Sequence, residues 1–105
     1  MKSPLSLPKP KLPKPKLPFI IRRVSGRSME PTFRPGKLVL IWQWSTKPTE
    51  GRIVVIKHNG LEKIKRVQQV RSGQIFVVGD NQDHSTDSRQ FGWLDQACIT
   101  GRVLF

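Results

Sequence analysis

Apolar and polar residues alternate over short stretches of the chain, with the period of two that is typical of β-strands. In residues 37–44 this alternation places Val39 and Ile41 on one face, while Trp42 and Trp44 share the other. No stretch of ten or more residues has the spacing of an amphipathic helix. The strands expected are residues 37–44, 53–58, 61–70, 74–78 and 97–105. We therefore expect a mostly β fold, a small and partly closed β-barrel or sandwich of about five or six strands.

The dipeptide Asn59-Gly60, between two of these stretches, is the strongest short signal for a two-residue hairpin loop. Such a loop fixes the register of the flanking strands, and cross-strand partners point to the same face of the sheet. The expected pairs are His58 with Leu61, Lys57 with Glu62, Ile56 with Lys63, Val55 with Ile64 and Val54 with Lys65. In this register Lys57 and Glu62 form an opposite-charge pair.

Lys65 is unusual because the predicted register places it on the same face as Val54, Ile56 and Val67. Burial disfavours the charged ammonium group, and a pKa lowered by about three units to near neutrality corresponds to about 4 kcal/mol. A lysine that is neutral near pH 7 can act as a general base. The pattern alone leaves two simpler explanations open: a side chain that extends to the rim of the sheet, or a different register.

Proline and charge divide the chain near residue 18. Residues 1–18 hold six of the nine prolines and five lysines, no acidic residue, and two copies of Leu-Pro-Lys-Pro-Lys. We expect this segment to be a disordered or polyproline II tail. Residues 19–105, with a net charge of +7, are expected to form the single folded domain. The tail either has no dedicated partner or makes peripheral contact with an anionic membrane, nucleic acid or acidic protein.

The longest apolar run, residues 38–42, is too short for a secretory signal or a transmembrane helix. The sequence therefore predicts a protein without a transmembrane anchor, either cytoplasmic or peripheral at a membrane. A single cysteine, Cys98, excludes an intramolecular disulfide and is interpreted as a small buried residue. Because His58 and His84 are the only histidines, we expect no metal site and no cofactor.

Three segments of the chain resemble type I signal peptidases and their relatives, and they occur in the same order. Residues 24–36 (VSGRSMEPTFRPG) resemble the Gly-x-Ser-Met-x-Pro-Thr segment that holds the nucleophilic serine, and residues 64–67 (IKRV) resemble the strand with the general-base lysine. Residues 79–92 (GDNQDHSTDSRQFG) are similar to that family's Gly-Asp-Asn-x-x-x-Ser-x-Asp-Ser-Arg-x-x-Gly segment. The resemblance implies a serine endopeptidase with a Ser/Lys catalytic dyad.

Position by position, the resemblance assigns Ser28 as the nucleophile and Lys65 as the base that deprotonates it and later activates the deacylating water. The Ser28 N–H would contribute to the oxyanion hole, where Gly26 offers no side-chain donor and Ser25 lies one position too far. Ser85 matches the serine that orients the lysine. Pro31 and Gly36 belong to the turn that presents the nucleophile, and Asp80 and Asn81 are expected to form turn hydrogen bonds. Asp87 and Arg89 match a buried ion pair with Ser88 beside them, and His84 is a variable loop residue. Met29, Trp42 and Trp44 are expected in a substrate groove, at a membrane-facing edge or in the core.

The chain differs from membrane-anchored signal peptidases, which carry an N-terminal transmembrane helix and often a second β domain inserted after the lysine strand. Here only residues 66–78 lie between Lys65 and the third motif. The chain therefore looks most like the small bacterial proteases that mature nickel-type superoxide dismutase by removing its leader peptide. The expected partner is a precursor protein with an N-terminal leader, and small residues before the scissile bond are the family's preference.

Three alternatives stay open. One is general processing of the signal peptidase I type at the membrane surface. The second is a self-cleaving repressor-type peptidase, which shares the dyad but usually carries a DNA-binding helical domain and lacks the third segment. The third is a basic module that binds nucleic acid or lipid without catalysis. No recognition helix and no aromatic-basic ribonucleoprotein motif are found, so nucleic acid is not the expected partner.

Overall fold

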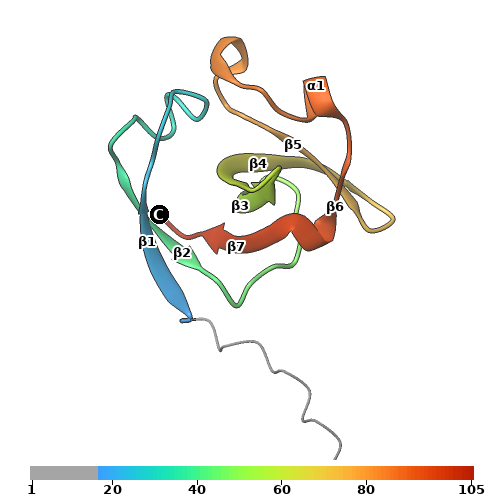
Figure 1. Cartoon of the computed structure of the whole chain (residues 1–105), viewed down its shortest axis with the longest axis horizontal. Helices are drawn as coiled ribbons and strands as arrows, with labels where there is room; N and C mark the ends of the chain where they lie inside the picture. The colour runs from blue at the N-terminus through green and yellow to red at the C-terminus, as the bar shows by residue number, and fades with distance from the viewer. Residues whose placement is uncertain (1–16) are drawn as a thin grey trace, which may run out of the picture.

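The computed structural model describes residues 17–105, which form one open antiparallel sheet of seven strands (Figure 1). The strands are β1 (Phe19–Arg23), β2 (Leu38–Trp42), β3 (Ile53–His58), β4 (Leu61–Arg71), β5 (Gln74–Val78), β6 (Leu94–Asp95) and β7 (Ile99–Val103). Their order across the sheet is β1-β2-β7-β3-β4-β5-β6. The mostly β prediction is confirmed, and the strands that the sequence pattern missed are the two outermost ones, β1 and β6.

Helical structure in residues 17–105 is limited to the four-residue helix α1 (Ser88–Phe91) and the 3-10 turns η1 (Gln82–His84) and η2 (Gln96–Cys98). The expected absence of a long amphipathic helix therefore holds for this part of the chain, in which no helix is long and apolar enough to span a membrane. Residues 1–16 of the predicted tail lie outside the described residues, so the division of the chain at residue 18 stays a prediction.

The predicted β3–β4 hairpin is confirmed with all five residue pairs in register. Asn59 and Gly60 have φ angles of 51° and 77°, as a type I′ turn requires. Lys57 and Glu62 are cross-strand partners as predicted, but the ion pair that Glu62 forms is with a residue of another strand. The carboxylate of Glu62 lies 3.1 Å from Nε of Arg22 on β1, because the curved sheet brings β1 and β4 toward each other although three strands separate them.

Two buried apolar clusters lie on opposite faces of the β3–β4 hairpin. One contains Val55 with Met29 and Phe33, and the other contains Val54, Ile56, Val67, Ile75, Val77 and Ile99. Lys65 belongs to the face of the second cluster and is only 4% exposed. Cys98 packs against the same cluster but is half-buried, so its interpretation as a buried residue needs correction. It is the last residue of η2, directly before β7.

The loop between β1 and β2 and the loop between β5 and β6 lie at the same end of the sheet (Figure 1). The Asn81 backbone N–H donates to the Ser28 carbonyl oxygen across a distance of 2.8 Å, which joins the two loops directly. Lys65 of β4 donates to Ser85 of the second loop and lines a cleft with Ser28 of the first, so residues from three distant parts of the sequence meet there.

Candidate active site

Ser28 is half-buried in the loop that follows β1. The neighbouring Met29 is 1% exposed and Phe33 is 7% exposed, so their side chains anchor this loop in the first apolar cluster. The Phe33 N–H donates to the Met29 carbonyl oxygen at 2.8 Å, and the Gly36 N–H donates to the Val24 carbonyl oxygen at 2.8 Å. The segment between the two strands is thus held by core packing on one side and by backbone hydrogen bonds at its base.

One glycine and one proline of this loop have unusual backbone geometry. Gly36 has a φ angle of 90°, which glycine adopts without strain. The bond between Glu30 and Pro31 is cis. Of the residues expected around the nucleophile, Gly26 and Met29 line the same cleft as Ser28.

Lys65 is buried on β4, and its Nζ donates to Oγ of Ser85 at 3.0 Å. Burial lowers the pKa of Lys65, while the negative charge of Asp87 opposes this shift and the positive charges of Lys63 and Arg89 add to it. The unfolded chain therefore binds a proton at Lys65 in a pH range where the folded chain does not. Within that range, between the lowered folded pKa and the unfolded pKa, this residue makes folding more favourable as the pH rises.

Ser85 connects Lys65 to a fully buried carboxylate. Its hydroxyl donates to Oδ2 of Asp87 at 2.6 Å, and Asp87 also accepts from the Gly79 N–H at 2.8 Å. Arg89 donates from Nη2 to the same carboxylate at 2.7 Å, forming the ion pair. Burial alone would raise the pKa of Asp87, but these hydrogen bonds outweigh it and hold the pKa of Asp87 far below its usual range. The carboxylate is therefore charged and fixed.

The start of α1 stabilises this arrangement. Asp87 is the N-cap residue: its side chain accepts from the Arg89 N–H at 3.1 Å, and its own N–H donates to the Gln90 side chain at 2.9 Å. The buried Ser88 hydroxyl accepts from the Val77 N–H on β5 at 2.9 Å. These bonds fix the position of Asp87, the acceptor of the Ser85 hydrogen bond, relative to the sheet.

Asp80 and Asn81 act differently from the turn hydrogen bonds expected for them, because their side chains reach across to other segments. Asp80 accepts from Thr32 of the loop that carries Ser28, and it accepts from Nε and Nη2 of Arg66, each at 2.8 Å. The Asn81 side chain donates to the Arg27 carbonyl oxygen at 3.1 Å. The Arg66 partner lowers the pKa of Asp80. Together these bonds tie the loop of Ser28 to the strand of Lys65.

Ser28 and Lys65 line one cleft of about 340 Å³, between the loop after β1 and β4. A neutral Lys65 amine has two N–H groups and one lone pair. Because the Ser85 hydroxyl gives its proton to Asp87, it receives an N–H from Lys65, and the lone pair of the amine stays available. A base with this orientation can take a proton from a hydroxyl group in the cleft.

Some residues that the sequence suggested for the site lie outside the cleft or at its rim, and two residues of the site were not identified from the sequence. Trp42 stacks on Phe19 at 6.3 Å and does not line the cleft, and Trp44 is 66% exposed. His84 is exposed at the rim of the cleft. Thr32 and Arg66, the two partners of Asp80, were not identified from the sequence, although both lie within the segments that carry the resemblance.

Gly79 is a further residue of the site that the sequence did not single out for a role. A Cβ atom at this position would lie 2.2 Å from Oγ of Ser85 and 2.6 Å from the Ser28 carbonyl oxygen, so only glycine leaves room for both. The missing side chain of Gly79 therefore allows the two loops to pack closely together. Within residues 17–105, no group of three His, Cys, Asp or Glu side chains is placed to hold a metal ion.

Comparison with known proteins gives matches along most of the chain. Residues 2–104 match the family described as Peptidase S24-like. Mitochondrial inner membrane protease subunit 2 of Schizosaccharomyces pombe is 31% identical over 77% of this chain and 60% of its own length. Mitochondrial inner membrane protease subunit 1 of Xenopus tropicalis is 33% identical over 75% of this chain and 63% of its own length.

A probable signal peptidase I-1 of Synechocystis is 49% identical over 35% of this chain and 19% of its own length. The chain thus spans less than two thirds of the length of each of these relatives. The family match, in contrast, covers nearly every residue. The chain therefore belongs to the Peptidase S24-like family.

Proposed function

We propose that the chain is a serine endopeptidase in which Ser28 is the nucleophile and Lys65 is the general base. The observation that supports this proposal most is the environment of Lys65. The side chain is 4% exposed, its pKa is lowered by burial, and it shares a cleft with Ser28. Ser85 and Asp87 orient the amine through hydrogen bonds of 3.0 Å and 2.6 Å. A purely structural lysine gains nothing from such burial, since apolar residues fill a core at lower cost.

The reaction follows from this arrangement in two stages. The neutral Lys65 amine takes the proton of the Ser28 hydroxyl while Oγ attacks the scissile carbonyl carbon, and the Ser28 N–H donates to the oxyanion. The resulting Lys65 ammonium then gives its proton to the leaving amine, which departs with the C-terminal product. In the second stage Lys65 removes a proton from water while the water oxygen attacks the acyl carbon. The Lys65 ammonium then returns that proton to Oγ of Ser28 as the ester C–O bond breaks, which releases the N-terminal product and regenerates the neutral amine.

We infer that the substrate is a precursor protein from which an N-terminal leader is removed. Relatives named as a signal peptidase and as inner membrane proteases support this class of substrate. Within it, the precursor of nickel-type superoxide dismutase is the specific candidate, because the short spacing of the second and third motifs resembles the proteases that mature that enzyme.

The direct test is incubation of the purified chain with this precursor, followed by mass spectrometry of the products. We expect one new N-terminus, and no such product with the Ser28→Ala variant. Cleavage of other leader-bearing precursors but not of this one would favour a general signal peptidase role. Cleavage within the chain itself, with no precursor processed, would favour the self-cleaving alternative.

We also propose peripheral contact with an anionic membrane. The outer face of β1 and β2 exposes Ile21 (62%) and Leu38 (55%), and Phe105 (71% exposed) lines the same shallow apolar depression. Residues 2–16 add five lysines and no acidic residue. An apolar surface and a cluster of lysines are the two features that attract a protein to an anionic lipid surface.

Deletion of residues 2–16 is expected to reduce binding to phosphatidylserine-containing vesicles at least about tenfold, because each lysine near an anionic surface contributes about 1 kcal/mol. The deletion stops before Leu17 because the Gln43 side chain donates to the Leu17 carbonyl oxygen at 2.9 Å. Co-sedimentation with the vesicles measures the effect, and phosphatidylcholine vesicles are the control. Peptide cleavage in solution should persist. Equal sedimentation of both chains would contradict the proposal.

A further inference from the structure

The cleft that holds Ser28 and Lys65 has an uneven charge distribution. Four other basic side chains line it, and one acidic side chain does. The basic residues are Arg22, Arg23, Arg27 and Lys63, and the acidic residue is Glu62. A cleft with one sign of charge concentrates ligands of the opposite sign. The composition of the cleft therefore favours a substrate segment with negative charge.

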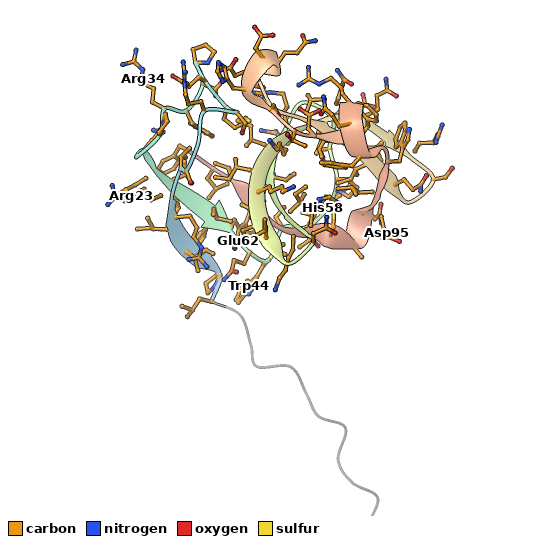
Figure 2. The ribbon with its side chains drawn as sticks, turned by 45° about the horizontal axis from the view of Figure 1, so that its top comes forward. Arg23, Arg34, Trp44, His58, Glu62 and Asp95 are labelled. Carbon is orange, nitrogen blue, oxygen red and sulfur yellow. The ribbon has the colours of Figure 1, made fainter. Side chains whose placement is uncertain are left out.

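Arg22 is the basic residue best placed to contact such a segment. It lies on β1 opposite Val39, on the face of that strand that looks into the molecule, whereas Arg23 follows it on the outer face. Figure 2 shows Arg23 pointing away from the margin of the sheet, while Glu62 lies on β4 where that strand faces β1. Arg27 pairs with Glu30 of its own loop, whose side chain is 25% exposed, against 44% for the Glu62 partner of Arg22.

Among the described side chains, one ion pair joins β1 to β4 at this part of the cleft, and it is a weak one. Arg22 and Glu62 form an ion pair at 3.1 Å, but their side chains are 48% and 44% exposed. Exposed ion pairs stabilise a protein little, since water and salt compete with the two partners. A carboxylate on a bound peptide can therefore replace Glu62 as the partner of Arg22 without a large loss of folding stability.

The register of β4 gives the distance from the ion pair to the reacting groups. Glu62 and Lys65 are three positions apart on β4, so their side chains leave opposite faces of the strand, and both residues line the cleft. A strand rises about 3.3 Å per residue, so the ion pair lies about 10 Å along β4 from Lys65. An extended peptide covers the same distance in about three residues.

We propose that the cleft selects substrates with an Asp or Glu side chain about three residues from the scissile bond, which Arg22 recognises and for which Glu62 competes. This inference rests on the proposed peptidase function, since it specifies the substrate of the same site. It makes Arg22 a specificity-determining residue. Glu62 then acts as an internal competitor that an acidic side chain of the substrate displaces.

The test uses pairs of peptides with an Ala-x-Ala core that carry either Asp or Asn at each position within four residues of the scissile bond. Their affinities are measured by fluorescence anisotropy with the full-length Ser28→Ala variant, which holds peptides without cleaving them. We expect one position at which Asp binds about fivefold more tightly than Asn, with a ratio that falls as salt is added. Arg22→Gln should bring this ratio close to one.

The competing carboxylate provides the second arm of the test. Glu62→Gln should raise the Asp/Asn ratio to about tenfold, because Arg22 is then free. Arg22→Lys should keep part of the preference, since it retains the charge but not the geometry. Lys47→Gln, which removes a charge outside the cleft, is the matched control and should leave the ratio unchanged.

The outcomes distinguish this inference from the proposed function. Equal affinity for Asp and Asn at every position, or an unchanged ratio in Arg22→Gln, would overturn the inference even if the wild-type chain cleaves the peptides. An Asp preference that depends on Arg22 would support the inference even if the wild-type chain cleaves none of them, while the peptidase function would then fail.

Discussion

Ser28→Ala is expected to lower kcat for cleavage of a leader peptide at least about a thousandfold, because loss of a nucleophile leaves only the acceleration due to binding and oxyanion stabilisation. Lys65→Ala should have an effect of the same order. Since both residues act on the same proton, the double variant should be no worse than either single variant. The rate is measured with an internally quenched peptide under single-turnover conditions.

Two further substitutions at Lys65 separate catalysis from folding. Lys65→Arg should be inactive near neutral pH, because a guanidinium group does not give up its proton there. Lys65→Met replaces a buried amine with an apolar side chain of similar length, so it should keep or raise the melting temperature while abolishing cleavage. Lys57→Met, at an exposed position of the same hairpin, is the matched control and should stay active. More than a tenth of wild-type activity in Lys65→Met would contradict the dyad.

The same assignment fixes the direction of the pH dependence. Only the neutral amine of Lys65 accepts a proton, so cleavage should increase as the pH rises through its pKa. Because burial lowers that pKa from the ordinary value of a lysine, the increase should occur at a lower pH than it would for an exposed lysine. An activity that increases only near the ordinary pKa of lysine would show that Lys65 is not held neutral.

The part of the site that could be predicted from the sequence is the part determined by local geometry. Asn59 and Gly60 specify a two-residue turn, the turn sets the register, and the register places Lys65 on an apolar face. Each step depends on neighbours in the chain. For this reason the five predicted pairs of the hairpin need no knowledge of tertiary contacts, and all five are present.

The outer strands β1 and β6 could not be predicted in the same way. β1 has a single residue that is not exposed, so its pattern lacks the alternation that marks a strand, and pairing with β2 defines it. β6 is two residues long and exists through its ladder with Gln74 and Ile75. Both strands are consequences of long-range pairing, which no local pattern records.

The contacts that join the loops could not be predicted from the sequence either, because they too are long-range contacts. Asp80 was expected to bond within its own turn, as aspartates in such loops commonly do. Instead it joins Thr32 to Arg66, residues that are distant from it along the chain. The ion pair of Arg22 with Glu62 likewise needs the curvature of the whole sheet, and the nearer Lys57 was the natural partner on the basis of register alone.

Gly79 shows how strongly the proposed site depends on this close approach of two loops. Most glycines of the described chain have positive φ angles and mark turns, but Gly79 is needed for space. In Gly79→Ala the new methyl group would meet Oγ of Ser85 at 2.2 Å and the Ser28 carbonyl oxygen at 2.6 Å, so one loop must move. Either movement displaces a group that the proposed reaction requires, because Ser85 orients the base and Ser28 is the nucleophile.

Gly79→Ala is therefore expected to lower kcat about a hundredfold, the loss typical of a displacement of about 1 Å at reacting groups. Overpacking should cost about 1–3 kcal/mol of stability, measured by denaturant unfolding. Gly73→Ala, at a turn with a φ angle of 81° and no neighbour within 4 Å, loses stability by backbone strain without touching the site. Its activity per folded molecule should equal that of the wild type.

A double-mutant cycle identifies the route by which the methyl group acts. Ser85→Ala alone removes the hydroxyl that joins Lys65 to Asp87, so it should lower kcat and change the pH at which cleavage increases. If Gly79→Ala acts by displacing that hydroxyl, adding Ser85→Ala to it should cause little further loss, since the two changes remove the same contact. Fully additive losses would mean instead that the methyl group acts through the loop of Ser28, by pushing its carbonyl oxygen away from the Asn81 N–H. In both cases the space at Gly79 keeps the nucleophile and the base in one arrangement, and an unchanged kcat in Gly79→Ala would show that the site tolerates their separation.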